Sequence, residues 1–69
     1  MINKFAIRLK ELRNEKGLTQ TQLAEKLGFT RVNISDWEWK GMEPSFDTVI
    51  KIAKFFDVTV DYLFGIEDY

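Results

Sequence analysis

The most constraining feature of this 69-residue sequence is a junction between two short helices that leaves room for only Gly28 and Phe29. Thr19 and Gln22 form the Thr-x-x-Gln pattern of a capping box, which predicts that a helix begins after Thr19. Gly28 ends that helix, and Thr30 is a suitable N-cap for the next one. Two helices joined by so short a glycine turn cannot lie antiparallel, so the sequence predicts that they cross steeply.

The rest of the chain contains three further helices with short connections. One runs from about Asn3 to Lys16, a second begins after Ser45 and ends near Asp57, and a short third follows Thr59. Apolar residues three and four apart give each helix a buried face. The expected core positions on these helices are Phe5, Leu9, Leu12, Val49, Ile52, Ala53, Phe56, Val60 and Leu63. We therefore predict an all-α fold of five helices that forms one domain over residues 1–69.

Two residue types are absent from the sequence, and their absence limits its chemistry. Without cysteine the chain forms neither disulfides nor thiolate metal sites, and without histidine it lacks the usual general base. We therefore expect no enzyme activity, no metal and no cofactor. The sequence has no long apolar run and no signal-peptide pattern, so we expect a cytoplasmic protein without membrane contact.

Charge is distributed unevenly along the chain. The net charge of −1 is not typical of a nucleic-acid binder. Residues 1–41, however, carry eight Lys or Arg against five Asp or Glu, whereas residues 42–69 carry two against six. The molecule can therefore attract phosphate with one face only.

Four segments at fixed spacing carry a resemblance to a known family. They are Leu18–Gly28 (LTQTQLAEKLG), Ile34–Glu38 (ISDWE), Pro44–Ser45 and Ile52–Lys54. In these residues the chain resembles the phage-repressor and Cro-like helix-turn-helix family (XRE-type regulators). The resemblance covers the chain from about Phe5 to Gly65 without an insertion.

The resemblance implies a five-helix, lambda-repressor-like DNA-binding domain with its helix-turn-helix at about residues 19–38. It also implies a transcriptional regulator that is usually dimeric on double-stranded DNA. The helix of Thr30–Trp37 would then enter the major groove.

By the same resemblance, two groups of residues face the duplex. Phosphates are contacted by Gln20 and Thr30, and we expect Lys40 to add a charge contact. Base edges are met by the positions that hold Arg31, Val32, Asn33 and Asp36. The resemblance also implies a pair between Arg13 and Glu38, which we interpret as structural.

Helical geometry supports the base-reading group independently. If Ile34 and Trp37 face the core, a rotation of about 100° per residue places Val32 and Asp36 most nearly opposite. Arg31 lies at the helix start, from which a long side chain can reach around.

The chemistry of the four side chains fits base edges. Arg31 can bond O6 and N7 of guanine, and Asn33 can bond N6 and N7 of adenine. Val32 can pack on a thymine methyl group, and Asp36 can accept a hydrogen bond from a cytosine amino group.

Three features of the sequence depart from the family pattern. Asp36 stands where relatives often carry a longer polar or basic residue, and Trp39 replaces a small or polar one. The usual glycine-then-basic order of the next turn is reversed as Lys40-Gly41. Trp39 has three alternative uses: packing over the following loop, stacking near the sugar-phosphate backbone, or contacting a partner.

The end of the chain is rich in aromatic and apolar residues. If only Leu63 and one neighbour are needed in the core, the others can form a two-fold contact between copies, together with Ile7. The residues available for this contact are Tyr62, Phe64, Ile66 and Tyr69. The alternative is that they pack back on the first helix.

Two hypotheses of function follow. The first is a sequence-specific regulator, most simply a repressor, that binds an inverted-repeat operator as a dimer. The second is a protein-interaction module on the same fold, such as an antitoxin, an antirepressor-like factor or a DNA mimic. The overall acidity, Asp36 and Trp39 favour the second hypothesis, whereas Arg31, Gln20 and the basic front half favour the first.

Overall fold

The computed structural model describes residues 3–66, which form five α-helices as predicted. The helices are α1 (Lys4–Glu15), α2 (Gln20–Leu27), α3 (Arg31–Trp39), α4 (Phe46–Phe56) and α5 (Val60–Leu63). α3 extends two residues beyond the expected end at Trp37, so Trp39 is its last residue. Within residues 3–66 no helix combines the length and the apolar character needed to cross a membrane.

The junction between α2 and α3 has the predicted geometry. The Thr19 hydroxyl accepts a hydrogen bond from the Gln22 backbone N–H (3.1 Å), and the Gln22 side chain accepts one from the Thr19 N–H (2.9 Å). Gly28 ends α2 in the left-handed region at φ 80°. The Phe29 N–H then donates to the carbonyl of Ala24 at 2.8 Å, which turns the chain into α3.

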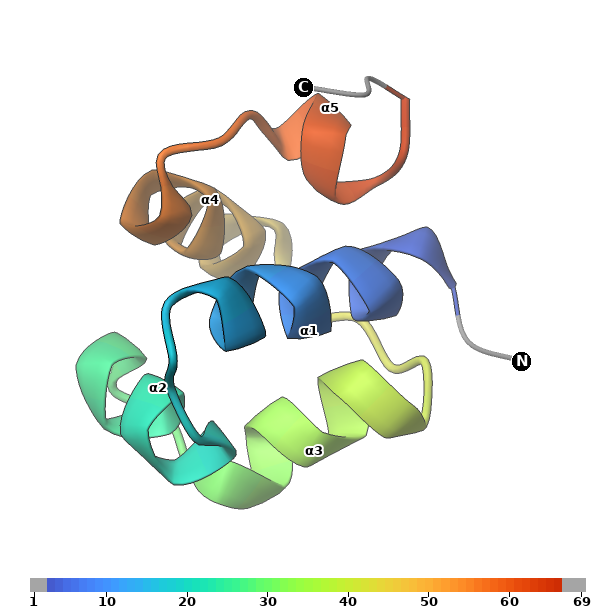
Figure 1. Cartoon of the computed structure of the whole chain (residues 1–69). Coiled ribbons are helices and arrows are strands. Elements are labelled where there is room, and N and C mark those ends of the chain that lie inside the picture. The colour runs from blue at the N-terminus through green and yellow to red at the C-terminus, as the bar shows by residue number, and fades with distance from the viewer. Residues whose placement is uncertain (1–2, 67–69) are drawn as a thin grey trace.

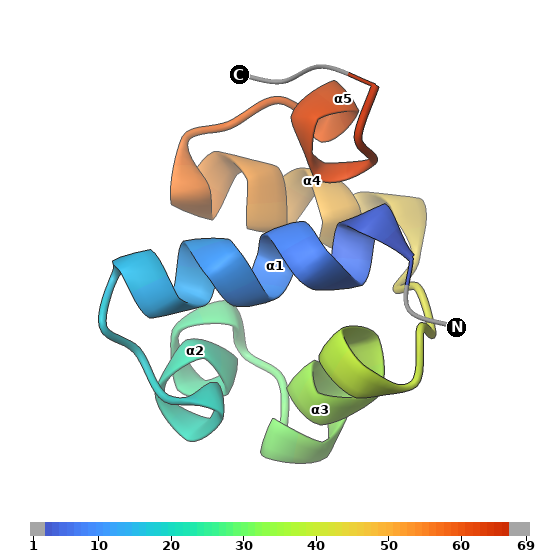
Figure 2. The same cartoon turned by 45° about the vertical axis from the view of Figure 1, so that its right-hand side comes forward.

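α1 lies in the middle of the molecule. α2 and α3 lie on one side of it, and α4 and α5 lie on the other side, as both views of the ribbon show (Figures 1 and 2). α1 packs directly against α3 and against α5. As a result, α3 and the C-terminal segment form two different surfaces of the protein.

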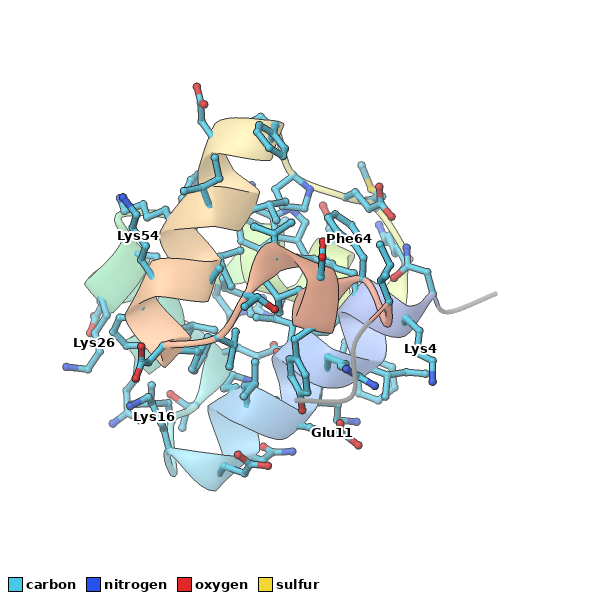
Figure 3. The ribbon with its side chains drawn as sticks, turned by 90° about the horizontal axis from the view of Figure 1, so that it is seen from above. Lys4, Glu11, Lys16, Lys26, Lys54 and Phe64 are labelled. Atoms are coloured by element: carbon cyan, nitrogen blue, oxygen red, sulfur yellow. The ribbon has the colours of Figure 1, made fainter. Side chains whose placement is uncertain are left out.

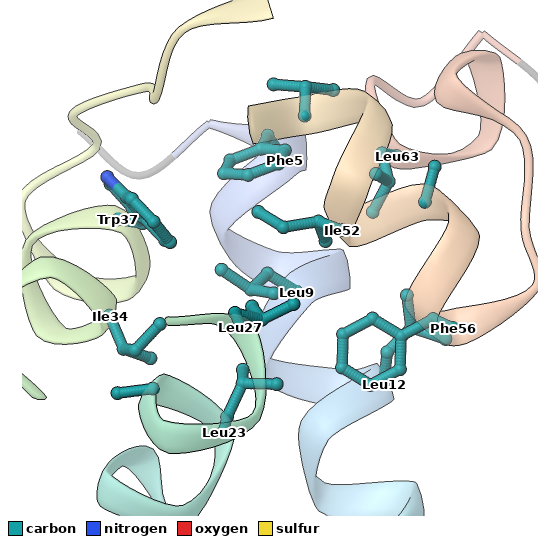
Figure 4. Packing of buried hydrophobic residues seen from close by; sticks show 13 residues of the cluster. Phe5, Leu9, Leu12, Leu23, Leu27, Ile34, Trp37, Ile52, Phe56 and Leu63 are labelled. Carbon is teal, nitrogen blue, oxygen red and sulfur yellow. The ribbon is translucent and has the colours of Figure 1, made fainter. Parts of the chain in front are cut away.

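A single apolar core holds all five helices together (Figure 4). The predicted core residues of α1 and α4 are buried, and so is Leu63 of α5. From α3 come Ile34 and Trp37, and the ring of Phe29 packs edge-on against Trp37 with 5.2 Å between ring centroids. Because Ile34 and Trp37 point inward, the opposite face of α3 is turned to solvent.

Candidate nucleic-acid interface

The first turn of α3 is held by a reciprocal cap between Thr30 and Asn33. The Thr30 hydroxyl accepts a hydrogen bond from the Asn33 backbone N–H (3.2 Å). The Asn33 side-chain oxygen accepts from the Thr30 N–H (3.1 Å) and from its hydroxyl (2.9 Å). In the free protein, therefore, the Asn33 amide stabilises the helix start, and an adenine contact requires it to share or leave this bond.

The outer side of α3 carries the other predicted base-reading side chains, and we call Arg31, Val32, Asn33 and Asp36 the reading face. Arg31 is exposed, and Val32 is 56% exposed, so both side chains are open to contact with a partner. Asp36 forms an ion pair with Lys40 one turn later, with 3.5 Å between Oδ1 and Nζ. This pair offsets the negative charge of Asp36 on a surface expected to meet phosphate.

A buried polar network fixes the angle of α3 against α1 and α2. Glu38 is 1% exposed, and its carboxylate accepts from Arg13 Nε (2.7 Å) and Nη2 (3.1 Å). Gln20, in the first turn of α2, donates its side-chain N–H to the same carboxylate at 3.1 Å. Arg13 Nη1 donates to the Leu18 carbonyl at 2.8 Å. Charge-assisted, bidentate hydrogen bonds of this kind define orientation as well as energy.

This Arg13–Glu38–Gln20 network engages the side chain of Gln20, for which the resemblance implies a phosphate contact. The Gln20 side chain is half-buried because it turns toward Glu38. The pair expected between Arg13 and Glu38 is present.

Trp39 lies at the end of α3 under a lysine from α1. It is 55% exposed, and the Lys10 ammonium lies 3.9 Å from the centroid of its ring. Sequence reasoning left the use of Trp39 open and gave Lys10 no individual role. The sequence did indicate that Lys10 lies near α3. Lys10 is three residues before Arg13 and so shares its side of α1, and Arg13 was expected to pair with Glu38.

Three further lysines gather on the opposite end of the molecule from Lys4 and Phe64 (Figure 3). Lys16 caps α1, and Lys26 and Lys54 lie in the last turns of α2 and α4. Cations at helix C-termini are favourable because they offset the negative end of the helix dipole. We therefore assign these lysines a structural role and leave them out of the interface.

The C-terminal aromatic residues pack largely on α1. Arg8 lies over the Tyr62 ring at 4.1 Å and donates to the Tyr62 carbonyl at 2.8 Å. The Phe64 ring lies 5.8 Å from that of Phe5. Ile66 is 73% exposed, whereas Tyr69 lies outside the described residues. Four residues were predicted for a two-fold contact, and the structure describes three of them. Of these three, Ile66 is the one exposed to solvent.

The described residues enclose no pocket, and no three of their acidic side chains gather as a metal site. The candidate site is an open helix surface.

A helix-turn-helix family model matches residues 9–63, which is most of the chain. The chain belongs to this helix-turn-helix family. The resemblance to XRE-type regulators inferred from the sequence is thereby confirmed.

Curated relatives of this helix-turn-helix protein include transcriptional regulators from bacteria and archaea. An uncharacterised regulator, YobD of Bacillus subtilis, is 38% identical over 93% of this chain and 57% of its own length. The activator BcrR of Enterococcus faecalis is 44% identical over 93% of this chain and 31% of its own. The chain thus spans about half or less of these two relatives. It covers 92% of the uncharacterised regulator MJ0272 of Methanocaldococcus jannaschii, which is 43% identical over 88% of this chain.

Solved structures of helix-turn-helix proteins share the fold. The P22 c2 repressor, crystallised with a synthetic operator, superposes with a TM-score of 0.82 at 25% identity, covering 91% of this chain and 96% of that one. The controller protein C.AhdI of Aeromonas hydrophila gives a TM-score of 0.76 at 36% identity, covering 88% of this chain and 92% of that one. The predicted lambda-repressor-like fold is therefore confirmed.

Proposed function

We propose that this chain is a sequence-specific DNA-binding regulator of transcription, acting in the cytoplasm and reading the major groove with α3. The observation that carries the proposal is the exposed start of α3, Arg31 and Val32, on a helix whose angle is fixed by the buried Arg13–Glu38–Gln20 network. A rigid helix with a solvated first turn suits this task, because the N-terminal residues of a recognition helix contact base edges. The P22 c2 repressor, of the same fold, was crystallised with an operator.

Within the reading face each side chain has a distinct task. Arg31 bonds guanine O6 and N7, and Val32 packs on a thymine methyl group. Asp36 accepts from a cytosine amino group, with Lys40 reducing its repulsion of nearby phosphates. Asn33 reads adenine after releasing its hydrogen bonds to Thr30.

Phosphate contacts surround this face. The Gln20 side chain is engaged by Glu38, so we assign its phosphate contact to the backbone N–H at the start of α2. The Thr30 hydroxyl donates to Asn33 in the free protein and can transfer that hydrogen bond to a phosphate. Lys40, whose side chain is largely exposed, supplies a charge.

Two copies would bind an inverted repeat. Half-sites of dimeric helix-turn-helix proteins lie about 34–36 Å apart, one helical turn of DNA. The protein measures 27 × 26 × 22 Å, so two molecules fit side by side over that spacing with each α3 displaced from the two-fold axis. Occupying such a site can block transcription directly, and we therefore propose repression.

The test is selection from a random duplex pool, followed by binding of Arg31→Ala to the enriched sequence. Arg31→Ala should lose about 1–3 kcal/mol of affinity and relax the preference at one base pair. Lys54→Ala is the matched control, because it removes a cation from the end of α4, which we place outside the interface. If Arg31→Ala binds every duplex as the parent does, α3 does not read bases as proposed.

A second candidate function is a protein-interaction module. It is favoured by the spacing of Val32, Asp36 and Trp39, which are four and three residues apart and so form an apolar-acidic-apolar stripe along α3. The salt response separates the two candidates. Binding to DNA weakens steeply with salt because counterions are released, and a flat response would remove the DNA hypothesis.

A further inference from the structure

Trp39, the last residue of α3, has a largely exposed side chain that contacts Lys10 on one side. The Lys10 ammonium lies 3.9 Å from its ring centroid, which covers one face of the indole and leaves the side chain 55% exposed. Trp37, two residues earlier, is buried in the core. Packing within the protein accounts for Trp37, whereas Trp39 keeps a large free surface.

The position of Trp39 along α3 determines what that surface can meet. Val32 and Trp39 are seven residues apart, which is two turns on one stripe and about 10 Å along the helix axis. The major groove is about 12 Å wide. If the first turn of α3 meets base edges, Trp39 lies near the wall of the groove, where the sugar-phosphate backbone runs.

The chemistry at this point matches a deoxyribose and its phosphate. Lys10 offers an ammonium group, the indole offers one N–H donor, and the open ring surface is apolar. Phosphate oxygens can accept hydrogen bonds from both donors, and the hydrophobic side of the sugar can pack against the ring. The only carboxylate on the outer stripe of α3, Asp36, is paired with Lys40 and does not oppose an anion here.

We infer that Lys10 and Trp39 form a backbone clamp, in which the two side chains together bind one deoxyribose phosphate of the strand bordering the groove. The inference rests on the proposed function and extends it to a residue of α1. The clamp adds affinity without sequence preference, because it touches no base edge.

The experiment uses the duplex enriched by the parent protein and titrates it at several salt concentrations. Lys10→Met keeps the apolar stem and removes the charge, so the slope of log K against log salt should become shallower by about 0.9. Trp39→Ala should weaken binding about tenfold while leaving that slope unchanged, because an apolar contact releases no counterion. Neither variant should change the preferred bases.

Fluorescence gives a second measurement on the same samples. The emission of the parent should change on binding, and Trp39→Phe should abolish this change, because Trp37 is buried away from the duplex. Lys54→Met is the matched control for Lys10→Met and should bind as the parent does. Urea unfolding of each variant establishes that it is folded.

The outcomes separate the two proposals. If selection with the parent protein enriches no duplex, the proposed function is wrong, and the clamp, which depends on it, is wrong as well. If the parent binds but Trp39→Ala and Lys10→Met match Lys54→Met, only the clamp is wrong, and Trp39 is then left as a surface for a protein partner. If either variant alters base preference, the pair contacts bases and the assignment to the backbone is overturned.

Discussion

At the scale of single residues, Glu38 is the charged side chain that the core buries among residues 3–66. It has no access to water and depends on Arg13 and Gln20 for its hydrogen bonds. Removing one partner of a buried pair costs about 3–5 kcal/mol, because the other charge stays buried without compensation. That is comparable to the whole stability expected from a core of this size.

We therefore predict that Arg13→Met is largely unfolded at 25 °C, and that the double variant Arg13→Met/Glu38→Met is more stable than Arg13→Met alone. In the double variant no buried charge remains, and two apolar side chains fill a similar volume. Urea unfolding of the parent, both single variants and the double variant gives the coupling energy. Additive losses would mean that the two side chains do not act as a pair.

The residue scale also marks the limit of sequence-based prediction at this site. Helical periodicity and family resemblance place Val32 and Asp36 on the outer side of α3. The spacing of a residue from Ile34 and Trp37 determines the side of the helix on which it lies. Periodicity and resemblance do not reveal that Gln20 bonds Glu38 or that Lys10 covers Trp39. These partners depend on side-chain directions between helices, and no single helix determines those directions.

At the scale of elements, local chemistry predicted the helix starts, and the end that it misplaced is that of α3. Thr19, Thr30, Ser45 and Thr59 are all N-caps, since a cap requires only a side-chain oxygen near its own backbone. α3 extends to Trp39 because no glycine or proline stops it before Gly41. α4 stops at Asp57, which adopts φ 57° and is the only non-glycine residue with positive φ among residues 3–66.

We predict that Asp57→Gly stabilises the protein by about 1 kcal/mol. The left-handed conformation costs an L-residue about 1–2 kcal/mol, and glycine avoids this cost. The greater entropy of glycine in the unfolded chain offsets about 0.5–1 kcal/mol of that gain. Removing a negative charge from a helix C-terminus adds about 0.3–1 kcal/mol. The melting temperature should rise by about 4–8 °C.

Asp57→Ala is the control for this prediction. It removes the same charge but keeps the β-carbon, so it should gain no more than the electrostatic part. Equal gains for the alanine and glycine variants would show that charge, and not backbone conformation, limits the end of α4.

At the scale of the whole molecule, the fold places the reading face and the C-terminal segment on two different surfaces. The sequence alone did not predict this separation. α3 and α5 lie on opposite sides of α1 (Figure 2). A contact between copies through the C-terminal segment therefore leaves the reading face open. Tyr62 and Phe64 have interactions with α1, so substituting them would disturb folding as well as any such contact.

Ile66 allows the proposed dimer to be tested without that complication. It is 73% exposed, so Ile66→Asp should leave the urea midpoint of the monomer unchanged. On a duplex with two half-sites, the variant should bind about tenfold or more weakly, because it loses the gain from linking two binding events. On a duplex with one half-site, it should bind as the parent does.

Phe46→Asp, which changes an exposed apolar residue at the start of α4, is the control. Sedimentation of each protein on the two-site duplex then reports the stoichiometry, and a two-to-one complex of unchanged affinity with Ile66→Asp would place the two-fold contact elsewhere.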